Sequence, residues 1–347
     1  MTNNQPIIEL ESLYKSFGAV QANKDISLKI NPGTIHGIVG ENGAGKSTLM
    51  SILYGFYKAD KGNIKIEGQK VSIGDSLAAI NTGIGMVFQH FKLVENFSVL
   101  ENIILGAETG NLIAQALASA RKTLSKLAKE YELNVNPDSL IENISVGMQQ
   151  RVEILKSLFR KAKILILDEP TGVLTPAEAE HLFRILKNLK NEGKTIILIT
   201  HKLKEIMSVT DTVSVMRQGT MTATLKTVDT NPEHLAELMV GRKVLLQIEK
   251  KPSQVGPSVL SCRKLNYTDE KGVKRLKDIS FNVRQGEILG IAGVAGNGQS
   301  ELLEVLSGIK NADGEIYVNS RKISLESKDS NPRSRRHLGI SHVPEDR

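Results

Sequence analysis

A stretch near the N-terminus has the residue types and the spacing of a loop that binds phosphate groups. It fits the pattern G-x-x-x-x-G-K-[ST] and comprises Gly40, Glu41, Asn42, Gly43, Ala44, Gly45, Lys46, Ser47 and Thr48. The glycines let the backbone curl until several N–H groups point at a polyphosphate, and the following helix adds positive potential. Lys46 can reach the β- and γ-phosphates, and the Ser47 hydroxyl can ligate Mg²⁺. The stretch therefore predicts a site for a polyphosphate and its magnesium ion.

Two acidic residues follow a short run, residues 164–167, that is entirely apolar. Such a run is typical of a strand that is buried on both faces of a parallel sheet. Asp168 can hold Mg²⁺, and Glu169 can polarise an attacking water. The alternative is a solvated strand end, which we favour less because a phosphate-binding loop lies upstream.

Three further side chains stand at the ends of predicted strands. His201 follows the apolar strand predicted at residues 195–199, and the carboxyl ends of parallel strands are where α/β sheets bind ligands. A single histidine is usually structural, but a contact with a γ-phosphate is reasonable here. Gln89 ends the strand predicted at 84–88. Phe17 ends an N-terminal strand, and its ring could be a core residue or could stack on a nucleobase.

The elements that must position these side chains alternate between strands and helices. The phosphate-binding loop lies between a buried strand at 35–39 and a helix at 47–54. Alternating apolar residues predict strands at 7–13 and 25–30, and we expect a turn at 61–63 before a strand at 64–67. Helices are predicted at 76–82, 176–191 and 231–240. This order indicates an α/β fold.

A helical insertion interrupts the α/β pattern. Between residues 99 and 159, apolar residues recur at spacings of three and four, which is typical of helices with one buried face. Ser145, Val146 and Gly147 open a polar helix predicted at 148–160. Their small side chains leave backbone N–H groups that could meet an anion.

The composition is that of a soluble globular protein, with 40% apolar and 24% charged residues in a chain of 347. We find no run of about 18 apolar residues and no signal peptide or lipidation motif, so we expect a cytosolic location. The net charge is +7, but Lys and Arg are spread along the chain. Nucleotide phosphates or an anionic membrane surface account for this excess equally well, and we expect no direct binding of nucleic acid. The single cysteine, Cys262, is expected in a strand.

The second half of the chain repeats the first. Asp278-Ile279-Ser280 repeats Asp25-Ile26-Ser27, and at the same offset Gly293, Gly296, Gly298 and Ser300 repeat Gly40, Gly43, Gly45 and Ser47. Gln299 stands where Lys46 does, and Glu301 stands where Thr48 does. A phosphate loop without its lysine predicts weak or absent hydrolysis. The copy ends at Pro344-Glu345-Asp346-Arg347, and so short an α/β unit cannot bury both faces of a sheet by itself.

The order of these features closely resembles the ATP-binding subunit of ABC transporters, over essentially the whole chain. The resemblance implies that Phe17 stacks on adenine, that residues 40–48 are the Walker A loop, and that Gln89 senses Mg²⁺ and couples to the membrane subunit. It implies that residues 144–149, with Ser145 and Gly147, form the signature motif. It also implies that Asp168 is the magnesium aspartate, Glu169 the catalytic base and His201 the switch histidine.

The chain departs in places from the commonest pattern of that family. Ile144, Val146 and Met148 stand where Leu, Gly and Gln are usual, and residues 172–175 lack the usual aspartate. Together with the fused second half, its lysine-free loop and residues 344–347, these departures resemble the tandem ATPases of simple-sugar and nucleoside importers. Residues 90–94 and 101–103 look more like the nucleoside members than the ribose or galactose members.

The resemblance implies a first ATPase domain at residues 1–246, with a helical subdomain at about 95–160. A linker at 247–258 and a partial, degenerate second ATPase domain at 259–347 would follow, so we expect the chain to stop within that domain. Two such domains sandwich ATP head to tail, each signature completing the other's phosphate loop. We therefore expect binding of ATP and Mg²⁺ with slow hydrolysis by this chain alone, unless first domains pair as a homodimer.

The implied function is that of the ATP-binding and ATP-hydrolysing subunit of an ABC importer for simple sugars or nucleosides. Its implied partners are transmembrane permease subunits and, through them, a substrate-binding protein, with the chain peripheral to the cytoplasmic side of the cell membrane. The alternative is a tandem ABC ATPase that acts on ribosomes or nucleic acid. Such proteins usually carry long charged helices between or within their domains, and no coiled-coil heptads appear here. A P-loop kinase would need neither the signature nor the duplication.

Overall fold

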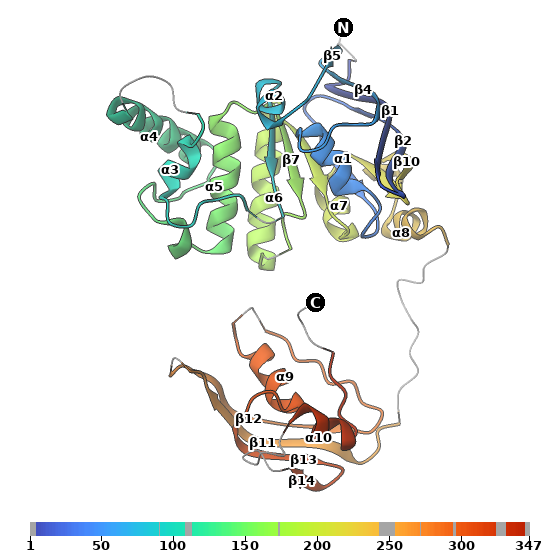
Figure 1. The fold of residues 1–347 in the computed structure, drawn as a ribbon, viewed down its shortest axis with the longest axis vertical. Coiled ribbons are helices and arrows are strands. Elements are labelled where there is room, and N and C mark those ends of the chain that lie inside the picture. The colour runs from blue at the N-terminus through green and yellow to red at the C-terminus, as the bar shows by residue number, and fades with distance from the viewer. Residues whose placement is uncertain are drawn as a thin grey trace. The chain divides into compact units, whose positions relative to one another are not determined.

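The computed structural model describes residues 5–89, 91–107, 113–172, 174–242, 254–270, 272–293, 296–323 and 331–343. They belong to two units, Met1–Gln247 and Ile248–Arg347, and each unit is described by itself (Figure 1). Several predicted features lie outside the described residues: His90, Val173, most of the linker (247–253) and residues 344–347. Within the described ranges, no helix is both long enough and apolar enough to span a bilayer.

The first unit begins with a four-stranded antiparallel sheet of strand order β2-β1-β4-β5. Its strands are β1 (Ile8–Phe17), β2 (Val20–Ile30), β4 (Lys61–Ile66) and β5 (Gln69–Val71). The turn predicted at residues 61–63 is wrong, because these residues open β4 and pair with β1. Gly62 has a φ of 100°, a conformation that suits glycine, and it lies where the pairing with β1 shifts register. The glycine that suggested a turn therefore marks an irregularity within a strand.

A six-stranded sheet of order β10-β9-β3-β8-β7-β6 forms the centre of the first unit. Its strands are β3 (Ile35–Val39), β6 (Ile84–Val87), β7 (Ile164–Asp168), β8 (Thr195–Ile199), β9 (Thr212–Arg217) and β10 (Thr220–Lys226). The strands run parallel except for β10, which pairs antiparallel with β9. Every residue of β3, β6, β7 and β8 is buried, which confirms the strands predicted from short apolar runs.

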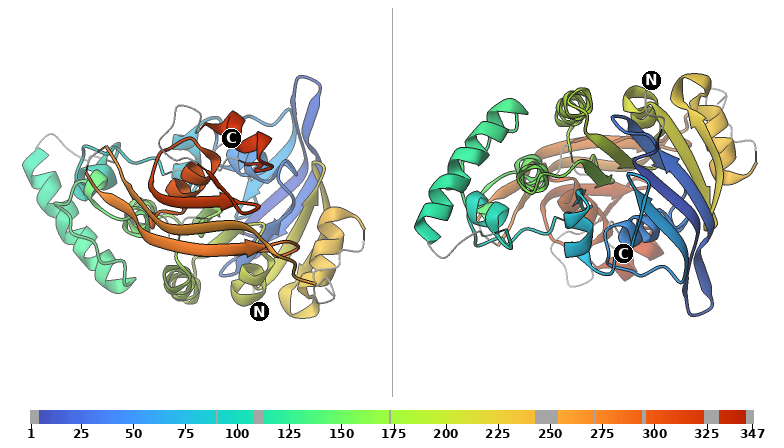
Figure 2. Two further views of the ribbon diagram at one scale, coloured as in Figure 1. Left: turned by 90° about the horizontal axis from the view of Figure 1, so that it is seen from below. Right: turned by 90° about the horizontal axis from the view of Figure 1, so that it is seen from above.

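Helices cover both faces of this sheet (Figures 1 and 2). They are α1 (Lys46–Leu53), α2 (Ser76–Asn81), α3 (Val99–Ile104), α4 (Ile113–Glu130), α5 (Val146–Phe159), α6 (Pro176–Asn191), α7 (Leu203–Val209) and α8 (Pro232–Val240), with 3₁₀ turns η1 (Ile141–Asn143) and η2 (Thr227–Asp229). Successive residues of β8 enter different cores. Ile196 and Leu198 belong to the core that includes α6, whereas Ile197 and Ile199 belong to the core that includes α1.

The predicted helical insertion is confirmed as α3, α4 and α5. Figures 1 and 2 show α4 at the edge of the first unit farthest from the antiparallel sheet. Helix α5 begins at Val146, earlier than the predicted start at residue 148. It begins there because the Ser145 hydroxyl oxygen accepts the backbone N–H of Met148 at 3.4 Å and caps the helix.

The second unit has an antiparallel sheet of order β12-β11-β13-β14. Its elements are β11 (Ser258–Thr268), β12 (Lys274–Arg284), α9 (Gln299–Ser307), β13 (Asp313–Val318), β14 (Arg321–Ile323) and α10 (Pro332–His337). Cys262 lies in β11 as predicted, inside a core that includes Leu265, Leu276 and Ile316. Residues 287–293 form no strand, and Ile288 is 82% exposed. The described residues of this unit include no parallel partner for that segment, so its apolar side chains remain exposed.

Candidate functional site

The phosphate-binding loop connects the end of β3 to the start of α1, and two of its glycines have left-handed backbones. Gly43 has a φ of 83° and Gly45 a φ of 95°. A Cβ on Gly45 would lie 2.2 Å from the carbonyl oxygen of Ala22, and one on Gly40 would lie 2.4 Å from that of Met216. No side chain caps the N-terminus of α1. The loop is therefore a tight backbone curl that leaves the helix N-terminus available to an anion.

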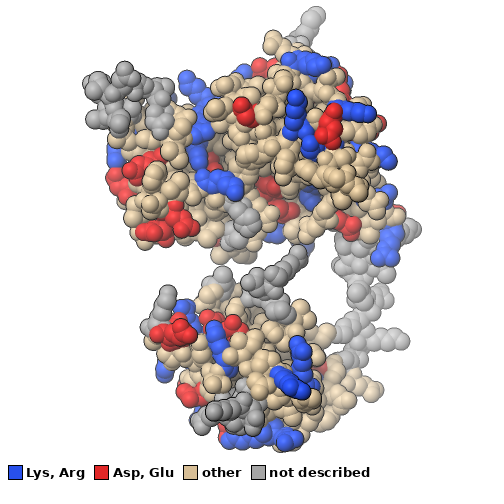
Figure 3. All heavy atoms as spheres, viewed as in Figure 1, with Lys and Arg blue, Asp and Glu red and all other residues tan. Residues whose placement is uncertain are grey.

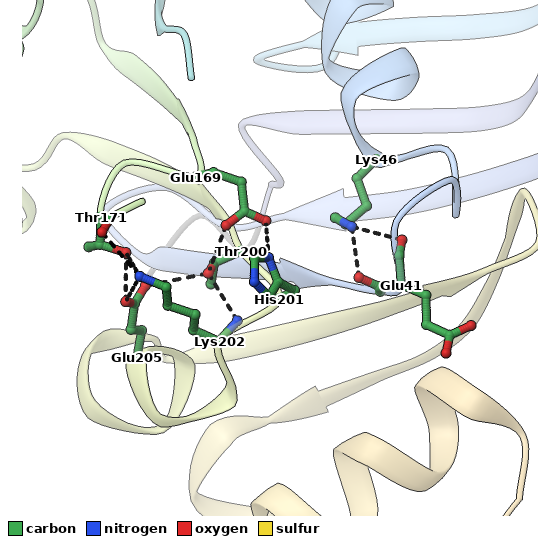
Figure 4. A network of polar contacts seen from close by, with 9 residues as sticks. Glu41, Lys46, Glu169, Thr171, Thr200, His201, Lys202 and Glu205 are labelled. Atoms are coloured by element: carbon green, nitrogen blue, oxygen red, sulfur yellow. Dashed lines mark hydrogen bonds and ion pairs between the residues drawn. The ribbon is translucent and has the colours of Figure 1, made fainter. Parts of the chain in front are cut away.

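Lys46 spans this loop and is 7% exposed. Its Nζ donates to the carbonyl oxygen of Gly40 at 2.7 Å and to that of Glu41 at 3.0 Å (Figure 4). Burial lowers the pKa of Lys46, and the nearby charges of Glu169 and Asp168 oppose that shift. The ammonium group is thus already desolvated and faces two carboxylates.

Asp168, the last residue of β7, is buried beside the loop. Burial raises the pKa of its carboxyl group, while a hydrogen bond from the Ser47 hydroxyl lowers it. The Ser47 hydroxyl, near the start of α1, and the Asp168 carboxylate, at the end of β7, thus lie next to one another. One hydroxyl and one carboxylate are hard oxygen ligands of the kind that Mg²⁺ takes together with phosphate oxygens and water. No cluster of three or more His, Cys, Asp or Glu suited to a metal occurs in the part of the chain that the structure describes.

Glu169 and His201 are brought together by the pairing of β7 with β8. Asp168 pairs with Ile199, so the residues that follow both strands lie side by side. His201 Nδ1 lies 2.8 Å from Glu169 Oε1 (Figure 4). Glu169 has a φ of 47°, a left-handed conformation that is uncommon outside glycine and clusters at functional sites. The imidazole is half-exposed, so this pair faces a space that a ligand can enter.

Phe17 is not a core residue, since 43% of it is exposed at the end of β1. Its ring meets the edge of Tyr57 with centroids 5.0 Å apart, and Lys15 Nζ lies 5.4 Å from its centroid. The core alternative is therefore excluded, and an exposed ring face is available.

The other predicted site residues, Gln89, Ser145 and Gly147, make no hydrogen bond with Lys46, Asp168 or Glu169 in the described part of the chain. Gln89 is exposed and follows β6. Strand β6 is the neighbour of β7, and its Val87 pairs with Leu167. Ser145 and Gly147 lie at the start of α5, and in the view of Figure 1 β7 and α6 lie between α5 and α1. No hydrogen bond joins Ser145 or Gly147 to residues 40–48 within the described ranges.

Sequence reasoning missed several polar residues that support the site. Thr171, Thr200, Lys202 and Glu205 form a hydrogen-bonded network around Glu169 (Figure 4). Thr200 directly precedes His201, which was the one available signal. Asn23 of β2 is fully buried, and its Nδ2 donates to the carbonyl oxygen of Gly45 at 3.1 Å. Nothing in the local sequence marks Asn23, because its partner is 22 residues away.

A phosphate-binding loop after one parallel strand and paired acids after another define a P-loop nucleotide hydrolase. The profile of the ABC transporter family matches residues 23–172 and 276–346. The chain belongs to this family, and it is an ATPase of the ABC type.

Comparisons with known proteins agree with that assignment. The nucleoside import ATP-binding protein NupA of Lactococcus lactis subsp. cremoris (strain MG1363) is 47% identical over 345 residues, covering 99% of this chain and 67% of that protein. The guanosine import ATP-binding protein NupO of Bacillus subtilis (strain 168) is 47% identical over 342 residues, covering 98% and 66%. This chain thus spans about two thirds of the length of these relatives.

A solved structure shares the fold of part of this chain. It is the dimeric structure of a post-hydrolysis state of the ATP-binding cassette MJ0796 bound to ADP and Pi. The TM-score is 0.55 with 26% sequence identity, over 63% of this chain and 98% of that one.

Proposed function

We propose that this chain binds ATP with Mg²⁺ and hydrolyses ATP to drive uptake of a nucleoside, or of a related simple sugar, through a membrane permease. The observation that carries the proposal is the convergence of Lys46, the Ser47–Asp168 pair and the Glu169–His201 pair at one edge of the central sheet. ATP hydrolysis needs a cation for the phosphates, ligands for Mg²⁺ and a base for water.

Each residue has a role in this proposal. Lys46 exchanges its loop carbonyl partners for β- and γ-phosphate oxygens, and the backbone N–H groups of residues 43–47 hold the phosphates. Ser47 and Asp168, with Gln89 from the neighbouring strand end, would hold the metal. Mg²⁺, when bound, would neutralise phosphate charge. Phe17 stacks on the adenine ring.

Glu169 accepts the proton of the attacking water, and His201 holds Glu169 and contacts the γ-phosphate. The hydrogen bond from His201 Nδ1 fixes one carboxylate oxygen, Oε1, while the other, Oε2, lies 3.3 Å from the Thr200 hydroxyl oxygen and is the oxygen that would take the proton. The partial exposure of both side chains supports this role, because water must reach them.

Ser145 and Gly147 act on a second cassette in this proposal. They lie at the capped but exposed start of α5, away from their own phosphate loop. Backbone N–H groups at a helix N-terminus stabilise anions, so they can complete the phosphate site of another domain. The dimeric solved relative supports such a pairing.

We infer that residues 1–246 are one ATPase domain, residues 247–258 a linker and residues 259–347 the beginning of a second, degenerate copy. The second family match at 276–346 and the antiparallel sheet followed by α9 support this division. Gln299 replaces the loop lysine there, so ATP hydrolysis is assigned to the first domain.

A groove on the first unit is a suitable docking site for a permease. Its volume is about 310 Å³, and its walls combine apolar and basic side chains: Tyr54, Phe56, Leu77, Phe88, Leu105, Lys92, Lys156 and Arg160. Lys92 follows Gln89 closely in sequence, so a partner helix in the groove would sense the loop that holds Gln89. We propose that this contact keeps the chain on the cytoplasmic side of the membrane, with a substrate-binding protein engaged through the permease.

The similarity to nucleoside importers favours a nucleoside as the cargo. The two relatives named for nucleoside and guanosine import are 47% identical, whereas relatives named for glucose and ribose import are 42% and 38% identical. A vesicle reconstitution with the permease tests this choice. Guanosine should stimulate ATP turnover, and stimulation by ribose alone would contradict it.

Action on ribosomes or nucleic acid is not favoured. On the face of the molecule that Figure 3 shows, basic and acidic side chains are interspersed among uncharged ones. Binding of nucleic acid usually rests on a basic stripe or patch that is interleaved with aromatic residues, and the sequence spreads Lys and Arg along the chain.

The first experiment is ATP turnover against protein concentration, for this chain and for Glu169→Gln, with the oligomer mass recorded at each point. A rate per chain that tracks dimer mass and vanishes in Glu169→Gln supports the proposal. Steady turnover by a demonstrably monomeric chain would contradict the need for a second cassette, and full activity of Glu169→Gln would remove Glu169 as the base.

A further inference from the structure

The hydroxyl group of Thr200 lies between two carboxylates. Its Oγ1 is 3.3 Å from Glu169 Oε2 and 3.4 Å from Glu205 Oε2 (Figure 4). Thr200 is fully buried, so no solvent competes for these contacts. A hydroxyl group has a single proton, and here its oxygen also accepts the backbone N–H of Lys202 at 3.1 Å. Thr200 can therefore donate a full hydrogen bond to only one carboxylate at a time.

Glu205 of α7 is the more firmly held of the two acids. Its Oε1 accepts the hydroxyl of Thr171 at 2.6 Å and lies 3.3 Å from Lys202 Nζ. Lys202 Nζ in turn donates to the carbonyl oxygen of Thr171 at 3.0 Å and to its hydroxyl oxygen at 3.1 Å. Glu205 thus ties the segment after β7 to the segment after β8. Glu169 has the half-exposed His201 as its other partner, so a ligand can reach this pair from the side of the imidazole.

We propose that Glu205 is a positioning residue that controls the placement of Glu169 Oε2 through the Thr200 hydroxyl. The inference rests on the proposed role of Glu169 as the base. When Thr200 donates to Glu169, its hydroxyl proton occupies Oε2, the carboxylate oxygen that His201 Nδ1 does not contact. When Thr200 donates to Glu205, Oε2 of Glu169 is released to accept the proton of the attacking water. Glu205 is therefore an alternative acceptor for the Thr200 proton, so that Oε2 of Glu169 can be released while the hydroxyl keeps a hydrogen-bond partner.

A single-turnover measurement tests this role, with the full chain in excess over radiolabelled ATP and Mg²⁺. In Glu205→Gln the amide can donate to Thr200, which then commits its own proton to Glu169. We expect the hydrolysis rate to fall about tenfold, the size of one charge-assisted hydrogen bond. The dissociation constant of ATP should stay within about twofold, because no phosphate contact is lost. Glu233→Gln, at an exposed position of α8, is the matched control and should keep the wild-type rate.

Substitutions at Thr200 show whether Glu205 acts through this hydroxyl. Because Thr200→Val removes the hydroxyl that competes for Glu169 Oε2, it should hydrolyse ATP faster than Thr200→Ser, which keeps the hydroxyl and should show the wild-type rate. The double variant with Thr200→Val and Glu205→Gln should be no slower than Thr200→Val alone. A slower double variant, or a wild-type rate in Glu205→Gln, would overturn the proposal. Should Glu205→Gln fail to fold, the Val and Ser variants decide the matter, since equal rates in both would exclude the hydroxyl.

The same measurements distinguish failure of the proposed function from failure of this inference. A wild-type single-turnover rate in Glu169→Gln would remove the base assignment itself. Loss of hydrolysis in Glu169→Gln, combined with an unchanged rate in Glu205→Gln, would leave the base assignment intact and reject only the positioning role.

Discussion

At the scale of the residue, His36 makes the stability of the first unit depend on pH. It is 2% exposed in β3, with Nε2 2.8 Å from Ser214 Oγ, and burial lowers its pKa from 6.5 to about 4. Between these values the unfolded chain binds a proton that the folded chain does not, so stability is present above pH 6.5 and is lost as the pH falls. About 3 kcal/mol of the free energy of unfolding should be lost by pH 4 through this group.

Urea unfolding measured from pH 7 to pH 4 checks that dependence. His36→Gln cannot titrate, so its free energy of unfolding should fall less over this range than that of the wild-type chain. His234→Gln, on the exposed side of α8, should retain the wild-type slope. Parallel pH profiles for the wild-type chain and His36→Gln would show that another group is responsible.

At the scale of the element, the β3–loop–α1 unit depends on glycine for two separable reasons. Gly45 has a left-handed backbone, and its Cβ would collide with the carbonyl oxygen of Ala22. Gly193, between α6 and β8, has a φ of 83° with no atom within 4 Å of a Cβ. Gly193→Ala should therefore cost only the backbone preference, about 1 kcal/mol. Gly45→Ala should cost clearly more and should also weaken ATP binding, because the loop must shift.

Thermal unfolding and ATP titration of these two variants separate the contributions. The Gly193→Ala variant should bind ATP as the wild-type chain does. Equal losses of stability in both variants, with ATP binding intact in Gly45→Ala, would mean that the loop accommodates the methyl group freely.

At the scale of the whole molecule, the two units have separate cores. Among the described residues, the two core clusters of the first unit contain none beyond 240, and the core of the second unit contains none before 260. A chain of residues 1–247 should therefore fold and bind ATP with an affinity within about threefold of the full chain. Lys46→Ala in the same short chain provides the negative control. Failure of residues 1–247 to fold would show that the first unit depends on the second.

The single cysteine gives a separate report on the second unit. Cys262 is 1% exposed, and burial raises the pKa of its thiol to about 12, so the reactive thiolate is scarce in the folded unit. Labelling of the native chain by a thiol reagent should be at least about a hundredfold slower than labelling in urea, because it requires local or global opening. Leu265→Ala, in the same core, should accelerate labelling without changing ATP binding. Rapid labelling of the native chain would contradict the buried position.

Local sequence determined the phosphate-binding loop, the buried strands and the approximate bounds of five helices, α1, α2, α5, α6 and α8. The reason is that their signals are short-range: a G-x-x-x-x-G-K-[ST] pattern, apolar runs of four or five residues, and apolar residues at helical spacing. The same local reasoning mistook residues 61–63 for a turn, because glycine with positive φ serves irregular strands as well as turns.

Only the tertiary structure decided which polar side chains meet. Asn23 of the antiparallel sheet reaches Gly45, and Ser47 reaches Asp168. Thr200 meets Glu169 because the parallel pairing of β7 with β8 aligns strand ends that are about thirty residues apart. The exposure of Phe17 was likewise undecided by sequence, since burial depends on what packs against the end of β1. The sequence thus determined the loop, strands and helices, which depend on local backbone chemistry. The contacts between the polar side chains of the site depend on how these elements pack and pair in the tertiary structure.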